Sequence, residues 1–230
     1  DGAPLSASLV SSDAGTHIRK PQGGVVVAVQ AIDERGTEVG RLIDERPFSA
    51  LQIRVLVLCS LIVMLDGYDI QTMALAVPTI AAEWSFALGD FGIALSAAVL
   101  GMGVGSAFLA PLGDRLGRRP VILTGFAVVG LSSLATISAG DITHFAAWRF
   151  ITGLGLGVCQ ANATALTSEY MPARARMSLV GLMFCCVAVG ASAASFTAPL
   201  IIEHMGWRGI FIVGGVGPLA LLAVLWFALP

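Results

Sequence analysis

Six long runs of apolar residues, each about the length of a membrane-spanning helix, follow one another through most of this chain. A bilayer core about 30 Å thick requires about 20 mostly apolar residues per helix. The runs cover residues 55–78, 91–112, 120–139, 145–166, 179–202 and 209–229. Because backbone polar groups must find partners inside lipid, such runs fold as helices. We therefore expect an all-α membrane protein with a six-helix transmembrane bundle over residues 46–230.

The composition agrees with a membrane protein and excludes several classes of function. Of the 230 residues, 56% are hydrophobic and 12% are charged, and the net charge of −2 leaves no clustered basic face for nucleic acid. The four cysteines lie in apolar runs without disulfide or metal-ligand spacing, so we interpret them as small buried hydrophobic residues. No metal or cofactor is expected. An enzyme is the least favoured class, because the runs contain no Ser/His or Cys/His constellation.

Basic residues in the connections predict the orientation of the bundle. Lys and Arg accumulate on the cytoplasmic side of short loops. Arginines precede the first run and occupy the second and fourth loops, whereas the first and third loops have none and the fifth has only Arg208. Both ends of the bundle are therefore expected in the cytoplasm. Residues 1–45 are polar and lack periodicity, which predicts a disordered cytoplasmic tail.

Two carboxylates interrupt the first apolar run, in the stretch MLDGYDIQTM. A charged side chain at the centre of a membrane helix costs roughly 2.5–3.5 kcal/mol on insertion scales. Asp66 and Asp69 are three positions apart and share one helix face, where two carboxylates in a low dielectric resist being ionised together. The runs contain no histidine at their centres. The aspartate pair is therefore our candidate for proton coupling.

Arg149 lies in the fourth run at a depth that matches Asp69. At 1.5 Å per residue, Asp69 is about 22 Å along its helix from Arg54, and Arg149 enters from the opposite side by about 8 Å. An arginine that reaches back to the interface is one reading. An ion pair with Asp69, or a substrate site shared with it, is the other.

Glycines recur in two runs, as GMGVG from Gly101 and GLGLG from Gly153. Small residues four apart allow helix backbones to approach closely in lipid, so we favour helix packing over a ligand role. No strand precedes either stretch and no Lys-Ser/Thr follows, which excludes a phosphate-binding loop.

The second loop, APLGDRLGRRP, resembles the Gly-x-x-x-Asp-Arg-x-Gly-Arg-Arg/Lys motif of the major facilitator superfamily. Five positions match, and Ala110 stands where the motif has its first glycine. The resemblance implies a bundle of two inverted three-helix repeats and a cytoplasmic gating motif. That motif comprises Asp114, Arg115, Gly117, Arg118 and Arg119. The fifth loop repeats its spacing as Glu203, Gly206 and Arg208, as expected of an inverted repeat.

The sequence Asp-Gly-Tyr-Asp in the first run resembles the aromatic acid:proton symporter family within that superfamily. The resemblance covers about Ile43 to Pro230 and implies the N-terminal half of a transporter. Such a protein imports a hydroxybenzoate-like aromatic carboxylate with protons across a bacterial inner membrane. Arg149 would neutralise an aspartate or the substrate carboxylate, and Tyr68 and Gln71 are weaker candidates for the cavity wall.

Two alternatives remain open at this point. One is a transporter of another solute, such as an aliphatic organic acid or a sugar, although the runs contain few amides to bind a sugar. The other is a membrane sensor or scaffold built from a half-transporter. With only one bundle's worth of runs, the chain is expected to need a second bundle, either a C-terminal half or another copy.

Overall fold

Helices account for almost all of residues 48–228, the part of the chain that the computed structural model describes. They are α2 (Ala50–Trp84), a 3-10 helix (Leu88–Phe91), α3 (Gly92–Val104), a π-helix (Gly105–Leu109), α4 (Leu112–Leu116), α5 (Arg118–Thr136), α6 (Ile142–Tyr170) and α7 (Arg176–Ala228). No strand occurs in these residues, so the expected all-α fold is confirmed. The tail predicted for residues 1–45 lies outside the described part.

A single glycine divides the longest helix, α7, into two arms. A straight helix of its 53 residues would be about 80 Å long, far more than a bilayer core. Gly206 instead has a φ of 67° and reverses the chain direction. The two arms coincide with the last two apolar runs, and a positive-φ glycine replaces the loop that was expected between them.

Four helical segments are long and apolar enough to cross a membrane: α2, Leu88–Leu109, α5 and α7. Because α7 folds back on itself, it supplies two crossings. α6 has 29 residues but is less apolar, because it carries Arg149, Gln160 and Asn162. The polar face of α6 therefore has to be satisfied inside the bundle.

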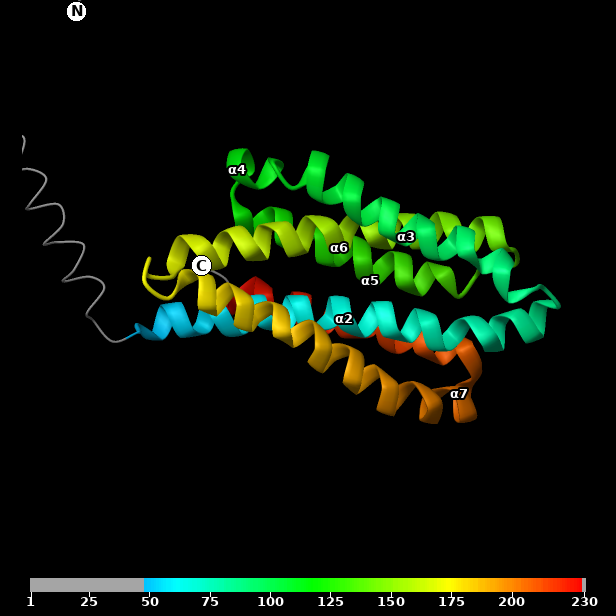
Figure 1. The fold of residues 1–230 in the computed structure, drawn as a ribbon. Helices are drawn as coiled ribbons and strands as arrows, with labels where there is room; N and C mark the ends of the chain where they lie inside the picture. Colours follow the sequence, from blue (N-terminus) through cyan, green and yellow to red (C-terminus); the bar gives the residue numbers. More distant parts are fainter. Residues whose placement is uncertain (1–47, 229–230) are drawn as a thin grey trace, which may run out of the picture. The chain divides into compact units, whose positions relative to one another are not determined.

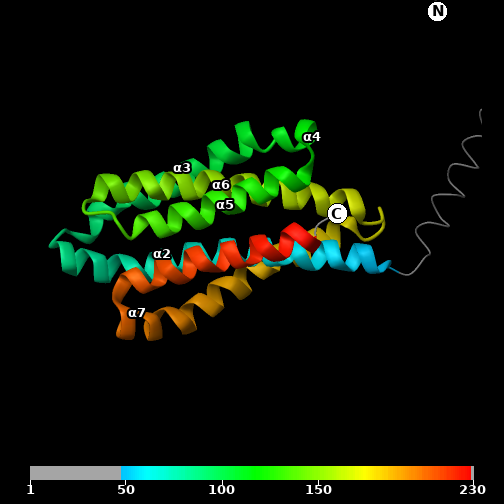
Figure 2. The ribbon, with the colours of Figure 1, turned by 180° about the vertical axis from the view of Figure 1, so that it is seen from behind.

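The connections gather at the two ends of the bundle in the alternation that six passes require. The start of α2, the α4–α5 turn, the α6–α7 connection and the end of α7 lie at one end (Figures 1 and 2). The bend of α7 and the α2–α3 and α5–α6 connections lie at the other. At the first end, Gln52 completes a capping box with Ser49 and also donates to the carbonyl of Tyr170, which ties α2 to α6.

The glycines of GMGVG and GLGLG pack α3 against α6. A Cβ atom at Gly101 would overlap the carbonyl of Phe150, and one at Gly153 would overlap the carbonyl of Ala98. The contact is thus reciprocal, with each helix presenting a glycine to the backbone of the other. The interpretation of these glycines as packing residues is confirmed.

The same reciprocal contact joins α2 to the first arm of α7. A Cβ atom at Gly67 would overlap the carbonyl of Val187, and one at Gly190 would overlap the carbonyl of Met64. Gly101 and Gly190 are as far apart in the sequence as Gly117 and Gly206, the two positive-φ glycines among the described residues.

Residues 48–228 therefore contain two related three-helix units. The first runs from α2 to α5, and the second from α6 through both arms of α7. This is the arrangement expected of an inverted repeat.

Aromatic rings fill the end of the bundle where α7 bends. Five rings contact one another with centroids 5.7 to 6.2 Å apart: Trp84, Phe91, Phe145, Trp207 and Phe211. Contacts of this geometry add to the free energy of burial. The interpretation of all four cysteines as buried was wrong, because Cys185 is exposed on the outer surface of α7, while Cys59 and Cys159 are buried.

The glycine contacts predict opposite effects for two neighbouring substitutions. Gly101→Ala places a methyl group against the carbonyl of Phe150 and should lower the melting temperature of the detergent-solubilised protein by several degrees. Gly103→Ala should leave it unchanged or raise it, because a Cβ atom there meets nothing within 4 Å and alanine favours helix. Equal shifts for the two variants would contradict close packing at Gly101.

Candidate functional site

An ion pair inside the bundle joins α2 to α6. Nη1 of Arg149 lies 3.1 Å from Oδ1 of Asp69, and the two side chains are 1% and 15% exposed. Both charged groups are therefore largely removed from solvent, where an arginine and a carboxylate are stable only as partners. Of the two interpretations of Arg149, the ion pair with Asp69 is the one that the structure shows.

Hydroxyl groups and an aromatic ring complete the surroundings of Arg149. Its Nη2 atom donates to the hydroxyls of Ser133, Thr136 and Thr152 at 3.5, 3.3 and 3.2 Å. The ring of Phe211 lies 4.9 Å from the guanidinium carbon, within the range of a cation–π interaction. Sequence reasoning did not identify these partners, although hydroxyl residues are frequent in the third run.

Asp66 faces α6 one turn away from the ion pair. Only 3% of Asp66 is exposed, and its Oδ2 atom accepts a hydrogen bond of 3.1 Å from the amide of Gln160. Its Oδ1 atom and the Nε atom of Arg149 are buried without a hydrogen-bond partner among the described residues. The two aspartates thus contact α6 at different levels: Asp66 faces the neutral amide of Gln160, and Asp69 faces the charged Arg149.

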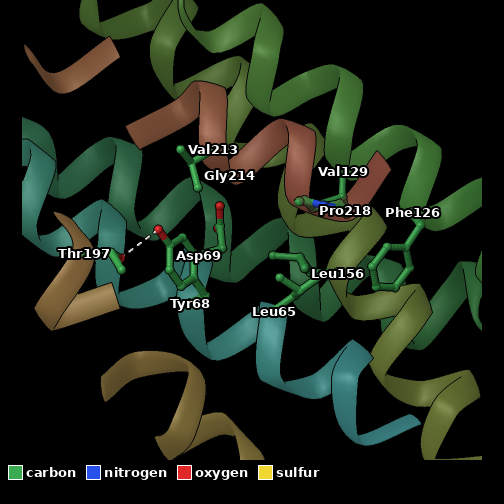
Figure 3. A pocket seen from close by; sticks show the side chains of 11 residues that line it. Leu65, Tyr68, Asp69, Phe126, Val129, Leu156, Thr197, Val213, Gly214 and Pro218 are labelled. Atoms are coloured by element: carbon green, nitrogen blue, oxygen red, sulfur yellow. Dashed lines mark hydrogen bonds between the residues drawn. The ribbon is translucent and has the colours of Figure 1, made fainter. Parts of the chain in front are cut away.

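Two cavities flank Asp69. One has a volume of about 240 Å³ and lies among α2, α5, α6 and both arms of α7 (Figure 3). The other, of about 140 Å³, lies among α2, α3 and α6 and reaches Arg149. Asp69 and Leu156 line both cavities.

The two weaker candidates of the sequence analysis differ in position. Tyr68 lines the larger cavity and shares a hydrogen bond of 3.0 Å with Thr197. Gln71 is half-buried and lines neither cavity.

The predicted gating motif forms a charge cluster centred on Arg118. Its Nη2 atom lies 2.5 Å from Asp114 and 2.9 Å from Glu169, at the end of α6. Its Nη1 atom donates to the amide oxygen of Asn162. The buried Asn162 in turn donates to the carbonyl of Ala110, so α6 is hydrogen-bonded to the residue at which the motif begins. Glu169 and Asn162 were not predicted as partners.

The other members of the motif shape the turn and its edge. Gly117 has a φ of 94°, a conformation that favours glycine, and it lets α4 turn directly into α5. Arg119 donates to the carbonyl of Trp226 near the end of α7, whereas Arg115 is exposed.

At the opposite end of the bundle, the related turn at Gly206 is also held by an acid. Glu83 accepts a hydrogen bond of 2.7 Å from Trp207 and lies 3.0 Å from Arg208. The arginines Arg119 and Arg208, which match in spacing, therefore both tie their turn to another helix.

The acid–arginine turn between the second and third helices of this bundle is the feature by which the sequence resembles one family. The family model for the Major Facilitator Superfamily matches residues 59–230. This chain belongs to the major facilitator superfamily. It is a membrane-integral protein, and its six passes form one half-bundle of that fold.

Two curated relatives are named as transporters of aromatic acids. The chain is 38% identical to a gallate transporter of Pseudomonas putida over 82% of its own length and 42% of the relative's. It is 39% identical to the 4-hydroxybenzoate transporter PcaK of Pseudomonas aeruginosa, over 84% and 43%. The chain therefore spans less than half the length of these relatives.

A solved structure supports the fold. The inward-open xylose transporter XylE from E. coli matches with a TM-score of 0.65 and 21% identity, covering 76% of this chain and 47% of that one.

The buried ion pair predicts a strong coupling between its two residues. Arg149→Met alone leaves Asp69 without its charged partner and should lower the free energy of unfolding by about 3–5 kcal/mol. Adding Asp69→Asn should recover much of this loss, since no buried charge then remains. Denaturation of the single and double variants in detergent measures the coupling. The exposed Arg208 provides the control, because Arg208→Met should cost only about 0–1 kcal/mol.

Proposed function

We propose that this chain is the N-terminal half of a proton-coupled symporter that imports a hydroxybenzoate-like aromatic carboxylate across a bacterial inner membrane. The observation that carries the proposal is the pairing of buried Arg149 with Asp69 next to a second buried carboxyl group, Asp66. Relatives named as gallate and 4-hydroxybenzoate transporters support the substrate class. Arginine-rich connections support a cytoplasmic location for both ends of the bundle.

Competition for Arg149 provides a route to coupling. Arg149 can neutralise one carboxylate, and in the structure this carboxylate is that of Asp69. Protonation of Asp69 would remove that negative charge and leave the guanidinium free to bind the carboxylate of a substrate in the adjacent cavity of about 140 Å³. Substrate and proton would then enter together, because each makes the binding of the other less costly.

Asp66 suits the role of a second proton site. Its environment contains a neutral amide and an oxygen without a partner, so the charged form is poorly compensated there. A proton that leaves Asp69 has an acceptor one turn away on the same helix face.

Replacing either aspartate separates coupling from folding. In cells that express the complete reading frame, Asp66→Asn and Asp69→Asn should each abolish uphill uptake of labelled 4-hydroxybenzoate while the protein remains in the membrane. An uncoupler should abolish wild-type accumulation in the same way. Asp141→Asn, at the exposed start of α6, is the control and should retain uptake. Wild-type accumulation by both Asn variants would contradict the coupling role.

We assign the charge cluster of Arg118 to the gate rather than to substrate recognition. The α4–α5 turn that carries it lies at the end of the bundle where α2 begins and α7 ends (Figure 1), whereas such folds bind substrate near the membrane midplane. The two acids that hold Arg118 belong to different repeats, Asp114 to the first and Glu169 to the second. Breaking this contact changes the relation between the repeats.

Charge removal at the gate should therefore slow transport without weakening binding. Asp114→Asn and Glu169→Gln should each reduce the turnover rate several-fold and leave the Kd for 4-hydroxybenzoate nearly unchanged. Transport assays and isothermal titration on the same preparations measure the two quantities. Loss of binding with normal turnover would overturn the assignment.

A single bundle is expected to need a partner bundle. Transporters of this fold bind substrate between two bundles, and a lone bundle leaves polar groups near its cavity face without partners. Liposomes containing this chain as verified monomers should not accumulate substrate in a proton gradient. Accumulation by monomers would refute this requirement.

A further inference from the structure

We propose that the cavity of about 240 Å³ beside Asp69 holds a phenolic ring, and that Tyr68 and Thr197 select ligands with a ring hydroxyl group. The proposal rests on the proposed function for the identity of the transported molecule.

The cavity exists because one of two equivalent helix contacts between the repeats is tight and the other is open. The last helix of the first repeat, α5, meets the first helix of the second repeat, α6, at Gly125 and Gly155, where added Cβ atoms would lie 2.5 Å from Cys159 and 2.7 Å from Val129. Gly125 and Gly214 are as far apart in the sequence as Gly117 and Gly206, so they occupy equivalent positions in the two repeats. Gly67 of α2 and Gly153 of α6 make the equivalent glycine contacts of the two repeats. Asp69 and Gly155 each lie two positions further along and are therefore equivalent as well.

The contact equivalent to Gly125 with Gly155 is therefore Gly214 with Asp69, and there the helices stand apart. A Cβ atom at Gly214 would meet nothing within 4 Å, and both residues line the cavity. A tight glycine contact has been replaced by an open space with a carboxyl group on its wall.

The size and the walls of this space suit one aromatic ring. Apolar side chains form most of the wall: Leu65, Phe126, Val129, Leu156, Val213 and Pro218 (Figure 3). An engineered apolar cavity of about 150 Å³ is enough to bind benzene. The volume beside Asp69 leaves room for a ring with substituents.

The direction of the hydrogen bonds at the edge of the cavity gives it a preference for donors. Thr197 donates its hydroxyl hydrogen to the carbonyl of Ala193 at 2.9 Å. A threonine hydroxyl has one hydrogen, so in its 3.0 Å contact with Tyr68 it must accept. Tyr68 is then the donor, and only the lone pairs of its oxygen remain for a ligand.

A phenol can donate to this oxygen, whereas an unsubstituted ring or a methyl ether cannot. Asp69, the other polar group of the wall, is also an acceptor. Tyr68 thus accepts a hydrogen bond from the ring hydroxyl of the ligand. Thr197 determines this preference, because it accepts the hydrogen of Tyr68.

Three fluorinated probes test the inference on the full chain in detergent by fluorine NMR. Wild-type protein should bind 4-fluorophenol about tenfold more tightly than fluorobenzene or 4-fluoroanisole. Tyr68→Phe should lose most of this preference for 4-fluorophenol. Thr197→Val frees the hydrogen of Tyr68 and should strengthen binding of 4-fluoroanisole, an effect that a merely structural role would not produce. Ser195→Ala is the control, because Ser195 makes the same backbone bond on the same arm away from the cavity.

Filling the cavity provides the second measurement. Gly214→Leu should abolish binding of all three probes, whereas Gly181→Leu, a helical glycine of α7 that also has nothing within 4 Å, should not. Equal wild-type affinities for the three probes, or unchanged binding in Gly214→Leu, would overturn the inference. Because no gradient is used, failure of aromatic acid uptake would contradict the proposed function alone.

Discussion

The ion pair between Arg149 and Asp69 is the interaction on which the arrangement of this bundle depends. A guanidinium with 1% of its side chain exposed needs partners on every side. α2 supplies the carboxylate, α5 supplies two hydroxyls and the second arm of α7 supplies an aromatic face. Four helices must therefore converge at one level, and the packing elsewhere has to permit it. The two cavities lie at this same level, on either side of Asp69.

Glycines allow that convergence. Where α3 meets α6, and where α2 meets the first arm of α7, each helix places a glycine against a backbone carbonyl of the other. Lipid offers no hydrophobic force between helices, so close backbone contact is one of the few terms that can hold them together. The two contacts are equivalent positions of one repeated unit. The repeats differ at Gly125 and Gly214. Gly125 packs tightly against α6, whereas Gly214 faces the cavity beside Asp69.

Much of the fold follows from the sequence because its signals are local. Run length predicts the number of passes, and helix geometry alone predicted that Arg149 and Asp69 lie at the same depth. Other features depend on how helices rotate and approach. The amide of Gln160 against Asp66, the hydroxyls around Arg149 and the acid of Glu169 beside Arg118 come from residues far apart in the chain. Hydropathy predicts a break before residue 209, but not that one glycine would make it, nor that Cys185 would face outward.

The contact between Gly67 and the carbonyl of Val187 has a mechanical consequence. Gly67 lies between the two aspartates of α2, and Gly190 of the same α7 arm packs against the carbonyl of Met64, less than one turn away on α2. With backbone packed against backbone at two points of this interface, α2 cannot rotate about its own axis without separating from α7. A change of charge at Asp69 therefore cannot be relieved by turning the helix. We therefore expect α2 and α7 to move together after such a change, so that the bundle responds as a rigid body.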